Sequence, residues 1–221
     1  MIYKYLKGTE NLQYGDIIQV WGTTYFPRLI NAHEVRDQKY LDKGKTTNKF
    51  WATTLAIFTA IKCIKKTGKE GRYPFHTGMF LGKDENGIDV ILEQQAVIKE
   101  SDLRKYDDQR TIAWYRPLPN MTEEQMKKLK AAVSRAKLTS LEKQFYAWKD
   151  IWNIRLSITK HQKQINSPSN YCTELIGKLY YYTLQVVIGI KIFWQNTPKD
   201  VHVYFENSPA LEWGYLYRRK E

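Results

Sequence analysis

The chain has 221 residues, of which 43% are hydrophobic and 26% are charged, and this composition indicates a globular protein and excludes a fibrous or disordered one. The length suits one sizeable core, so we expect a single domain over residues 1–221. The 35 Lys and Arg exceed the 23 Asp and Glu and give a net charge of +12, which favours contact with an anionic polymer or surface. The lysines are nevertheless spread along predicted helix faces, as on an ordinary solvated surface.

The two cysteines, Cys63 and Cys172, lie far apart in unlike contexts, and no Cys and His spacing is typical of zinc. The sequence therefore predicts no disulfide framework, no metal and no cofactor, which fits a reducing compartment. No stretch has the length and apolar character of a signal peptide or a membrane-spanning helix, since the apolar run 184–194 is short and contains Gln185 and Lys191. We expect a cytoplasmic protein without an integral membrane segment.

Turn residues and hydrophobic patterns divide the chain into predicted strands and helices. A turn at Gly15-Asp16 precedes a β-rich stretch that ends at Gly22. A lysine-rich passage and a helical pattern indicate an insertion at about residues 28–72, with Cys63 in a structural position near its end. A capping-box pattern at residues 122–125 predicts the start of a helix. The remaining predicted strands are 110–117, 200–205 and 214–217.

Two β-rich runs, 73–82 and 87–97, flank a short polar loop and predict a β-hairpin. If the glycines that bound the loop lie opposite each other, His76 directly faces Glu93. A carboxylate in that position can hold one imidazole nitrogen and orient the ring as a base. A slip of one residue would bring Gln94 there instead, and a slip of two would bring Ile91 or Gln95. An ordinary surface pair is the alternative interpretation of the contact.

Cys172 follows a chain break at residues 167–169 and a good N-cap residue, Asn170, and it precedes apolar residues at helical spacing. The pattern predicts that Cys172 lies in the first turn of a helix that packs on the core. The helix dipole and the free N–H groups of that turn favour the thiolate, which attacks carbonyl carbon, and the same groups can bind an oxyanion. A buried structural cysteine is the alternative interpretation.

Several short motifs follow one another in a recognisable order. They are Gly15-Asp16, His76-Thr77-Gly78, Glu93, Arg116-Pro117 and Tyr171-Cys172-Thr173-Glu174-Leu175. This order resembles the circularly permuted, YiiX-like branch of the NlpC-type papain-like cysteine hydrolases. The resemblance implies an α+β fold in which the cysteine-bearing helix packs on a small antiparallel sheet. It also implies a catalytic triad, with Cys172 as nucleophile, His76 as base and Glu93 as the residue that orients the base.

Three more polar residues, Tyr171, Asp16 and Gln94, are candidates for contact with the oxyanion or the substrate. The expected function is a thiol-dependent hydrolase, an amidase or peptidase acting on peptide-like amides that include cell-wall peptides. One alternative is a hydrolase or acyltransferase that uses the same triad on lipid-linked amides or esters. The other is a non-catalytic basic module that binds nucleic acid or another anionic polymer.

Overall fold

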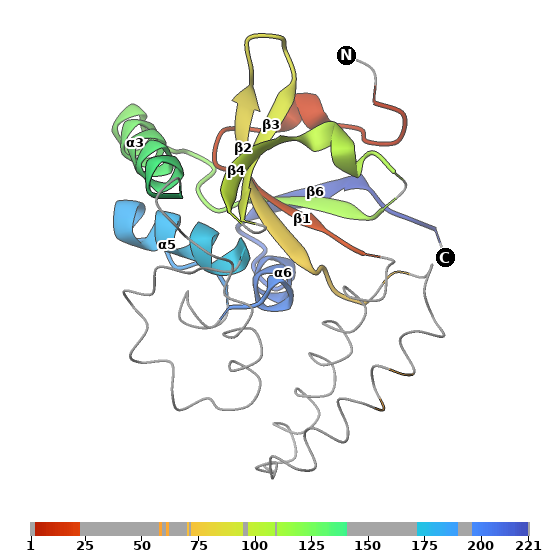
Figure 1. Ribbon diagram of the computed structural model, residues 1–221. Helices are drawn as coiled ribbons and strands as arrows, with labels where there is room; N and C mark the ends of the chain where they lie inside the picture. Colours follow the sequence, from red (N-terminus) through yellow and green to blue (C-terminus); the bar gives the residue numbers. More distant parts are fainter. Residues whose placement is uncertain are drawn as a thin grey trace, which may run out of the picture.

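The computed structural model describes residues 3–22, 58, 61, 70, 72–94, 97–108, 110–140, 172–189 and 196–220. Within these ranges the chain forms one antiparallel sheet of six strands and three α-helices (Figure 1). The strands are β1 (Ile17–Val20), β2 (His76–Lys83), β3 (Asp89–Gln94), β4 (Ile98–Asp102), β5 (Ile112–Arg116) and β6 (Glu212–Tyr217). The helices are α3 (Glu123–Ser140), α5 (Cys172–Leu184) and α6 (Pro198–Glu206), with short 3-10 helices η1 (Thr9–Asn11) and η2 (Leu103–Tyr106). The expected α+β class is confirmed.

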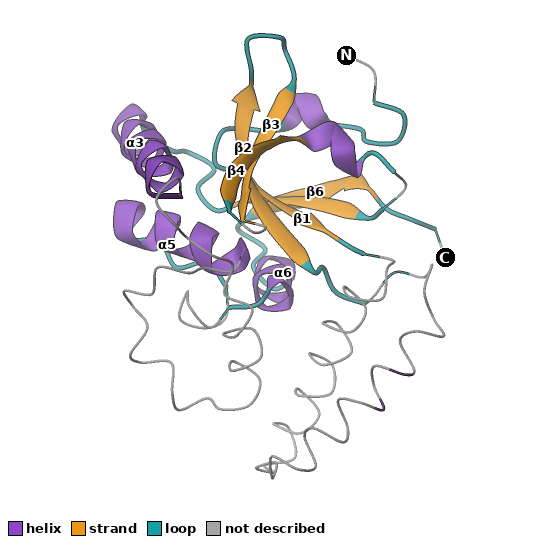
Figure 2. Cartoon of the chain, viewed as in Figure 1, coloured by secondary structure: helices purple, strands orange, loops and turns teal. Residues whose placement is uncertain are grey.

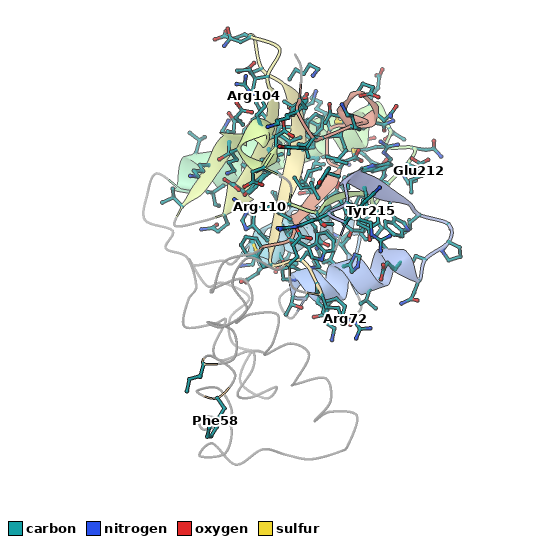
Figure 3. All side chains as sticks on the ribbon, turned by 90° about the vertical axis from the view of Figure 1, so that its right-hand side faces the viewer. Phe58, Arg72, Arg104, Arg110, Glu212 and Tyr215 are labelled. Atoms are coloured by element: carbon teal, nitrogen blue, oxygen red, sulfur yellow. The ribbon has the colours of Figure 1, made fainter. Side chains whose placement is uncertain are left out.

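The strands follow the order β4-β3-β2-β1-β5-β6, and each neighbouring pair is antiparallel. β2 lies between β1 and β3, so His76, its first residue, is carried by an interior strand that is paired on both sides. β6 is an edge strand, and Glu212 and Tyr215 mark its position in Figure 3.

The sheet has a core on each face. The α-helices lie on one face, and the N-terminal segment and η2 lie on the other (Figure 2). Because successive residues of a strand point to opposite faces, the strands other than β4 contribute to both cores. The helix-side core includes Ile17, Met79, Leu92, Tyr115, Leu129, Leu175, Leu179 and Phe205, and the opposite core includes Tyr3, Leu6, Ile18, Phe80, Ile91, Leu103 and Tyr106.

The β2–β3 hairpin is confirmed, but its predicted register is wrong. The hairpin closes at Lys83 and Asp89, and a β-bulge between Phe80 and Gly82 shifts the pairing, so Gly78 lies opposite Glu93. His76 is therefore not the direct cross-strand partner of Glu93. The register differs from the prediction by two residues, and an even shift keeps both side chains on the same face.

The predicted strand at residues 200–205 is also wrong, because these residues belong to α6. Thr197 is the N-cap and Pro198 is the first helical residue. The Thr197 side chain accepts from the Asp200 backbone N–H, and the Asp200 carboxylate accepts from the Thr197 N–H at 2.9 Å. This capping box, with proline at the first position, outweighs the β propensity of the valines and aromatic residues that follow.

Other predictions hold. β1 and β5 lie within the predicted strands, and β6 includes the predicted strand 214–217 but begins two residues earlier, at Glu212. α3 begins after Thr122, which exchanges capping-box hydrogen bonds with Gln125 at 2.9 and 3.2 Å. The predicted insertion at 28–72 lies outside the described residues except for positions 58, 61, 70 and 72, as does Cys63. None of the described helices is both long enough and apolar enough to cross a membrane.

Candidate active site

Cys172 is the first residue of α5, and its side chain is buried. The helix runs in the same direction as β2. The Thr173 hydroxyl lies 3.2 Å from the Thr77 hydroxyl near the start of β2. Tyr180 donates to the carbonyl of Gly15, whose own N–H donates to the Phe80 carbonyl further along β2 at 2.8 Å. This packing places the sulfur beside the first residues of β2. Cys172 Sγ lies 3.9 Å from Thr173 Oγ1 and receives a backbone hydrogen bond from Thr77.

His76 connects the thiol to a carboxylate. Its Nε2 lies 2.9 Å from Glu93 Oε2, and its side chain is also hydrogen-bonded to Cys172. Because Nε2 is occupied by Glu93, Nδ1 is the nitrogen left for the sulfur. The structure therefore brings together the three residues that the sequence predicted, from α5, β2 and β3.

Gly78 makes room for this contact. It lies directly opposite Glu93 on the adjacent strand, on the face that carries His76. A Cβ at position 78 would approach the backbone oxygen of Leu92 to 3.1 Å and Glu93 Cβ to 3.8 Å. The absence of a side chain here lets the Glu93 carboxylate reach diagonally across the strands to the His76 ring.

Glu93 is fully buried and accepts hydrogen bonds from four side chains within the described residues. Oε2 accepts from His76 and from the Tyr106 hydroxyl at 2.8 Å. Oε1 accepts from Ser101 Oγ at 2.6 Å and from the ammonium of Lys105, with which Glu93 also forms an ion pair. Burial opposes ionisation, but these donors outweigh it and lower the pKa of Glu93 below its usual range.

The same contacts change the proton affinities of Cys172 and His76. Burial disfavours both charged forms. Hydrogen bonding with His76 and the charge of its ring outweigh burial at the thiol and lower the pKa of Cys172. The contacts with Cys172 and Glu93 outweigh it at the imidazole and raise the pKa of His76 to about 9. The arrangement therefore favours a thiolate–imidazolium pair at neutral pH.

Asp16 lies outside this site, which corrects the expectation that it contacts the substrate or the oxyanion there. It precedes β1, and the other end of that strand pairs with His76. Both Asp16 oxygens accept from the Arg116 guanidinium, at 3.0 and 2.9 Å, and Gln13 N–H donates to Oδ2 at 2.8 Å. A pocket of about 280 Å³ adjoins this ion pair, but the carboxylate already has its partners.

Gln94 and Tyr171 remain predictions as substrate or oxyanion contacts. Gln94 is fully buried and follows Glu93 in β3, so its side chain points to the helix-side face and cannot orient the His76 ring. Its carboxamide atoms have no hydrogen-bond partner among the described residues. Tyr171 lies outside the described residues.

Sequence reasoning missed the three residues that hold Glu93 together with His76. Ser101 is in β4, and Lys105 and Tyr106 are in η2, which begins where the Asp102 carboxylate accepts from Arg104 N–H at 2.7 Å. The Asp102 capping signal was present in the sequence. The position of η2 over Glu93, however, depends on the pairing of β3 with β4, which no local pattern reveals.

No protein-family model and no curated protein sequence matches the chain. Among solved structures, the chain is similar to the crystal structure of metalloprotein YiiX from Escherichia coli O157:H7, described as DUF1105. The TM-score is 0.50 and the sequence identity is 15%, and the alignment covers 91% of this chain and 96% of the other. At this identity the similarity shows the fold alone.

Proposed function

We propose that this protein is a thiol-dependent hydrolase that cleaves peptide-like amides, with Cys172 as nucleophile, His76 as base and then acid, and Glu93 as the residue that orients His76. The observation that carries the proposal is the buried chain of hydrogen bonds from the Cys172 sulfur through the His76 ring to Glu93. A nucleophile held by a base, which is in turn held by a third group, is the arrangement that covalent acyl-transfer catalysis requires.

In the first half of the reaction, the Cys172 thiolate attacks the carbonyl carbon of the substrate and forms an S–C bond. The imidazolium of His76 gives its proton to the leaving nitrogen as the C–N bond breaks, which leaves a thioester on Cys172. Water then attacks the thioester and neutral His76 accepts a proton from it. The C–S bond breaks, the carboxylic acid leaves, and the thiolate–imidazolium pair is regenerated. The Cys172 N–H, in the first turn of α5, is a donor for the oxyanion.

Two features support a permuted papain-like fold for this chain. A solved structure with a similar fold bears the YiiX name, which is also the name of the branch that the sequence motifs resemble. In addition, the histidine precedes the cysteine along the chain, in the order expected of that branch. Together these features favour a cysteine hydrolase over an unrelated protein with a buried thiol.

YiiX is described as a metalloprotein, but a metal is not carried over to this chain. Within the described residues, no group of three or more His, Cys, Asp or Glu side chains could hold a metal ion. In the candidate site, both Glu93 oxygens already accept from His76, Tyr106, Ser101 and Lys105. The donor set therefore does not fit a metal, and the proposed reaction includes none.

Alkylation tests the nucleophile directly. Iodoacetamide near neutral pH is expected to label Cys172 in preference to Cys63, as mapped by mass spectrometry, and His76→Ala is expected to slow the labelling. His202 supplies the matched control, because it is also buried but its ring contacts Tyr115 and Glu206 instead of the thiol. His202→Gln should therefore leave the labelling rate unchanged. Preferential labelling of Cys63, with Cys172 inert, would end the proposal.

A substrate panel tests the chemical class. Peptide amides, including cell-wall peptides, N-acyl amines with a lipid chain, and esters matched to both are incubated with the native protein and with Cys172→Ala. Cleavage of peptide amides that disappears in the variant supports the proposal. Preference for the lipid-linked compounds would indicate that the same catalytic residues act on a lipid-linked substrate. Binding to an anionic polymer that is lost in modest salt and retained by Cys172→Ala, with no turnover, would favour a non-catalytic module.

A further inference from the structure

One short segment supplies most of the support for Glu93. Of the six residues from Ser101 to Tyr106, three donate to its carboxylate: Ser101 from the end of β4, and Lys105 and Tyr106 from η2. Arg104 and Arg110, on either side of Tyr106, show where this segment lies in Figure 3. The carboxylate is therefore held from one side by β4 and η2 and from the other by His76.

Lys105 differs from the other two donors of the segment because it is charged. Its ammonium pairs with Oε1, while His76 contacts Oε2, so the two cationic groups approach opposite oxygens of one carboxylate. The Lys105 side chain is 30% exposed, whereas that of Glu93 is fully buried. Lys105 thus connects a buried charged site to solvent.

We propose that Lys105 is a positioning residue that acts through Glu93: its charge compensates the buried carboxylate and limits how strongly Glu93 holds the proton on His76. The inference rests on the proposed function, since it assumes that the thiolate of Cys172 is the reactive species. Lys105 contacts neither Cys172 nor the substrate in this scheme. Its effect is electrostatic and passes through the carboxylate.

The direction of the effect follows from the charges. Without Lys105, the site is one unit more negative, so the imidazolium of His76 holds its proton to higher pH and the thiol of Cys172 loses its proton at higher pH. Both limbs of the pH profile of Cys172 alkylation should therefore move together to higher pH. Within the described residues, the other charged or titratable groups near the Lys105–Glu93 pair are Lys99, Asp102, Tyr106 and Arg110, and all of them are retained in the variants below.

The test is the pH dependence of Cys172 alkylation, followed by mass spectrometry of the Cys172 peptide. For Lys105→Met, both limbs are expected to shift upward by about 0.5–1 pH unit at low salt, and the shift should shrink as salt increases. Lys105→Arg keeps the charge and should leave the limbs in place. Lys137→Met is the matched control, because it removes the same charge from a lysine paired with the exposed Glu100. Circular dichroism checks that each variant is folded, and Lys105→Gln is the second neutral variant.

The outcomes separate this inference from the proposed function. An upward shift in Lys105→Met that is absent from Lys105→Arg and Lys137→Met supports it. Unchanged limbs in both neutral Lys105 variants would overturn it, and so would an equal shift of the limbs in Lys137→Met. An equal loss of Cys172 alkylation in Lys105→Met and Lys105→Arg would overturn it as well. If the native protein shows no thiolate at neutral pH, the proposed function itself fails.

Discussion

Two buried carboxylates lie toward opposite ends of the β1–β2 pair and have different partners. Asp16 is held by the Arg116 guanidinium, which also donates to Glu212 and to the Asn11 carbonyl. Glu93 is held by Lys105, Tyr106, Ser101 and His76, and His76 continues the chain of contacts to the Cys172 thiol. Burial dominates at Asp16 and raises its pKa, whereas the donors dominate at Glu93 and lower its pKa.

The comparison shows which buried network can carry chemistry. A guanidinium stays protonated at any physiological pH, so the Asp16–Arg116 pair fixes the meeting of β1 and β5 and cannot move a proton. The Glu93 network ends in an imidazole and a thiol. These two groups can pass a proton to each other, and they titrate between neutral and alkaline pH. The first network is therefore structural, and the second is the candidate catalytic site.

The largest expected effect comes from removing the nucleophile. Cys172→Ala should reduce amide cleavage at least about 10⁴-fold, because no other group in the site can form the thioester. Cleavage is measured on the most rapidly hydrolysed member of the substrate panel, and stability is compared by thermal unfolding. Retention of more than a tenth of the activity would contradict the assignment of catalysis to the site of Cys172.

The next largest effect concerns stability at the other network. Asp16→Ala leaves Arg116 buried without its main partner and should cost about 3–5 kcal/mol in the free energy of unfolding, measured by urea denaturation. At urea concentrations below the denaturation midpoint of the variant, the pH profile of Cys172 alkylation should be the same as in the native protein. A shifted profile with unchanged stability would show that the two networks are not separate.

The Glu93→Gln variant tests whether the Glu93 carboxylate stabilises the proton on the His76 ring. The neutral amide loses the charge that stabilises the imidazolium, so the pKa of His76 should fall from about 9 toward its ordinary value. Turnover should fall about 10²- to 10³-fold, because the ring loses both its orientation and its acid form. In a pH–rate profile the alkaline limb should move to lower pH. An unmoved limb would mean that Glu93 does not act on His76.

The smallest effect tests an element that lies outside both networks. Thr197→Ala removes the capping-box acceptor of α6 and should cost about 1 kcal/mol in unfolding free energy, as for other N-caps. Alkylation of Cys172 should not change. Thr122→Ala, at the capping box of α3, is the matched variant, and a much larger cost at Thr197 alone would indicate that α6 supports more than its own end.

Local signals in the sequence were reliable where one short segment determines the structure. The β2–β3 hairpin and the start of α3 depend on turn glycines and a capping box, and both were predictable. The register was missed by two residues because the ladder closes at Lys83 and Asp89 and not at the glycines, and the bulge between Phe80 and Gly82, which has no local signal, offsets only one residue of that difference. The capping box at Thr197 was present in the sequence, but the alternating β-branched residues after it favoured a strand.

The candidate site was predictable only in part, for the same reason. Cys172, His76 and Glu93 were identified from a helix start, a hairpin and a family resemblance. The donors Lys105 and Tyr106 reach Glu93 only after β3 pairs with β4, and Asp16 meets Arg116 only after β1 pairs with β5. These pairings are set by the whole sheet, so motif order could not distinguish a catalytic from a structural role for Asp16.

The most direct test of the central claim is the ultraviolet absorbance of the Cys172 thiolate as a function of pH, taken as the difference between the native protein and Cys172→Ala. A thiolate that persists well below the ordinary cysteine pKa, and that is lost at neutral pH in a His76→Ala variant, is the predicted result. A sulfur that ionises at or above the ordinary value, with or without His76, would contradict the account.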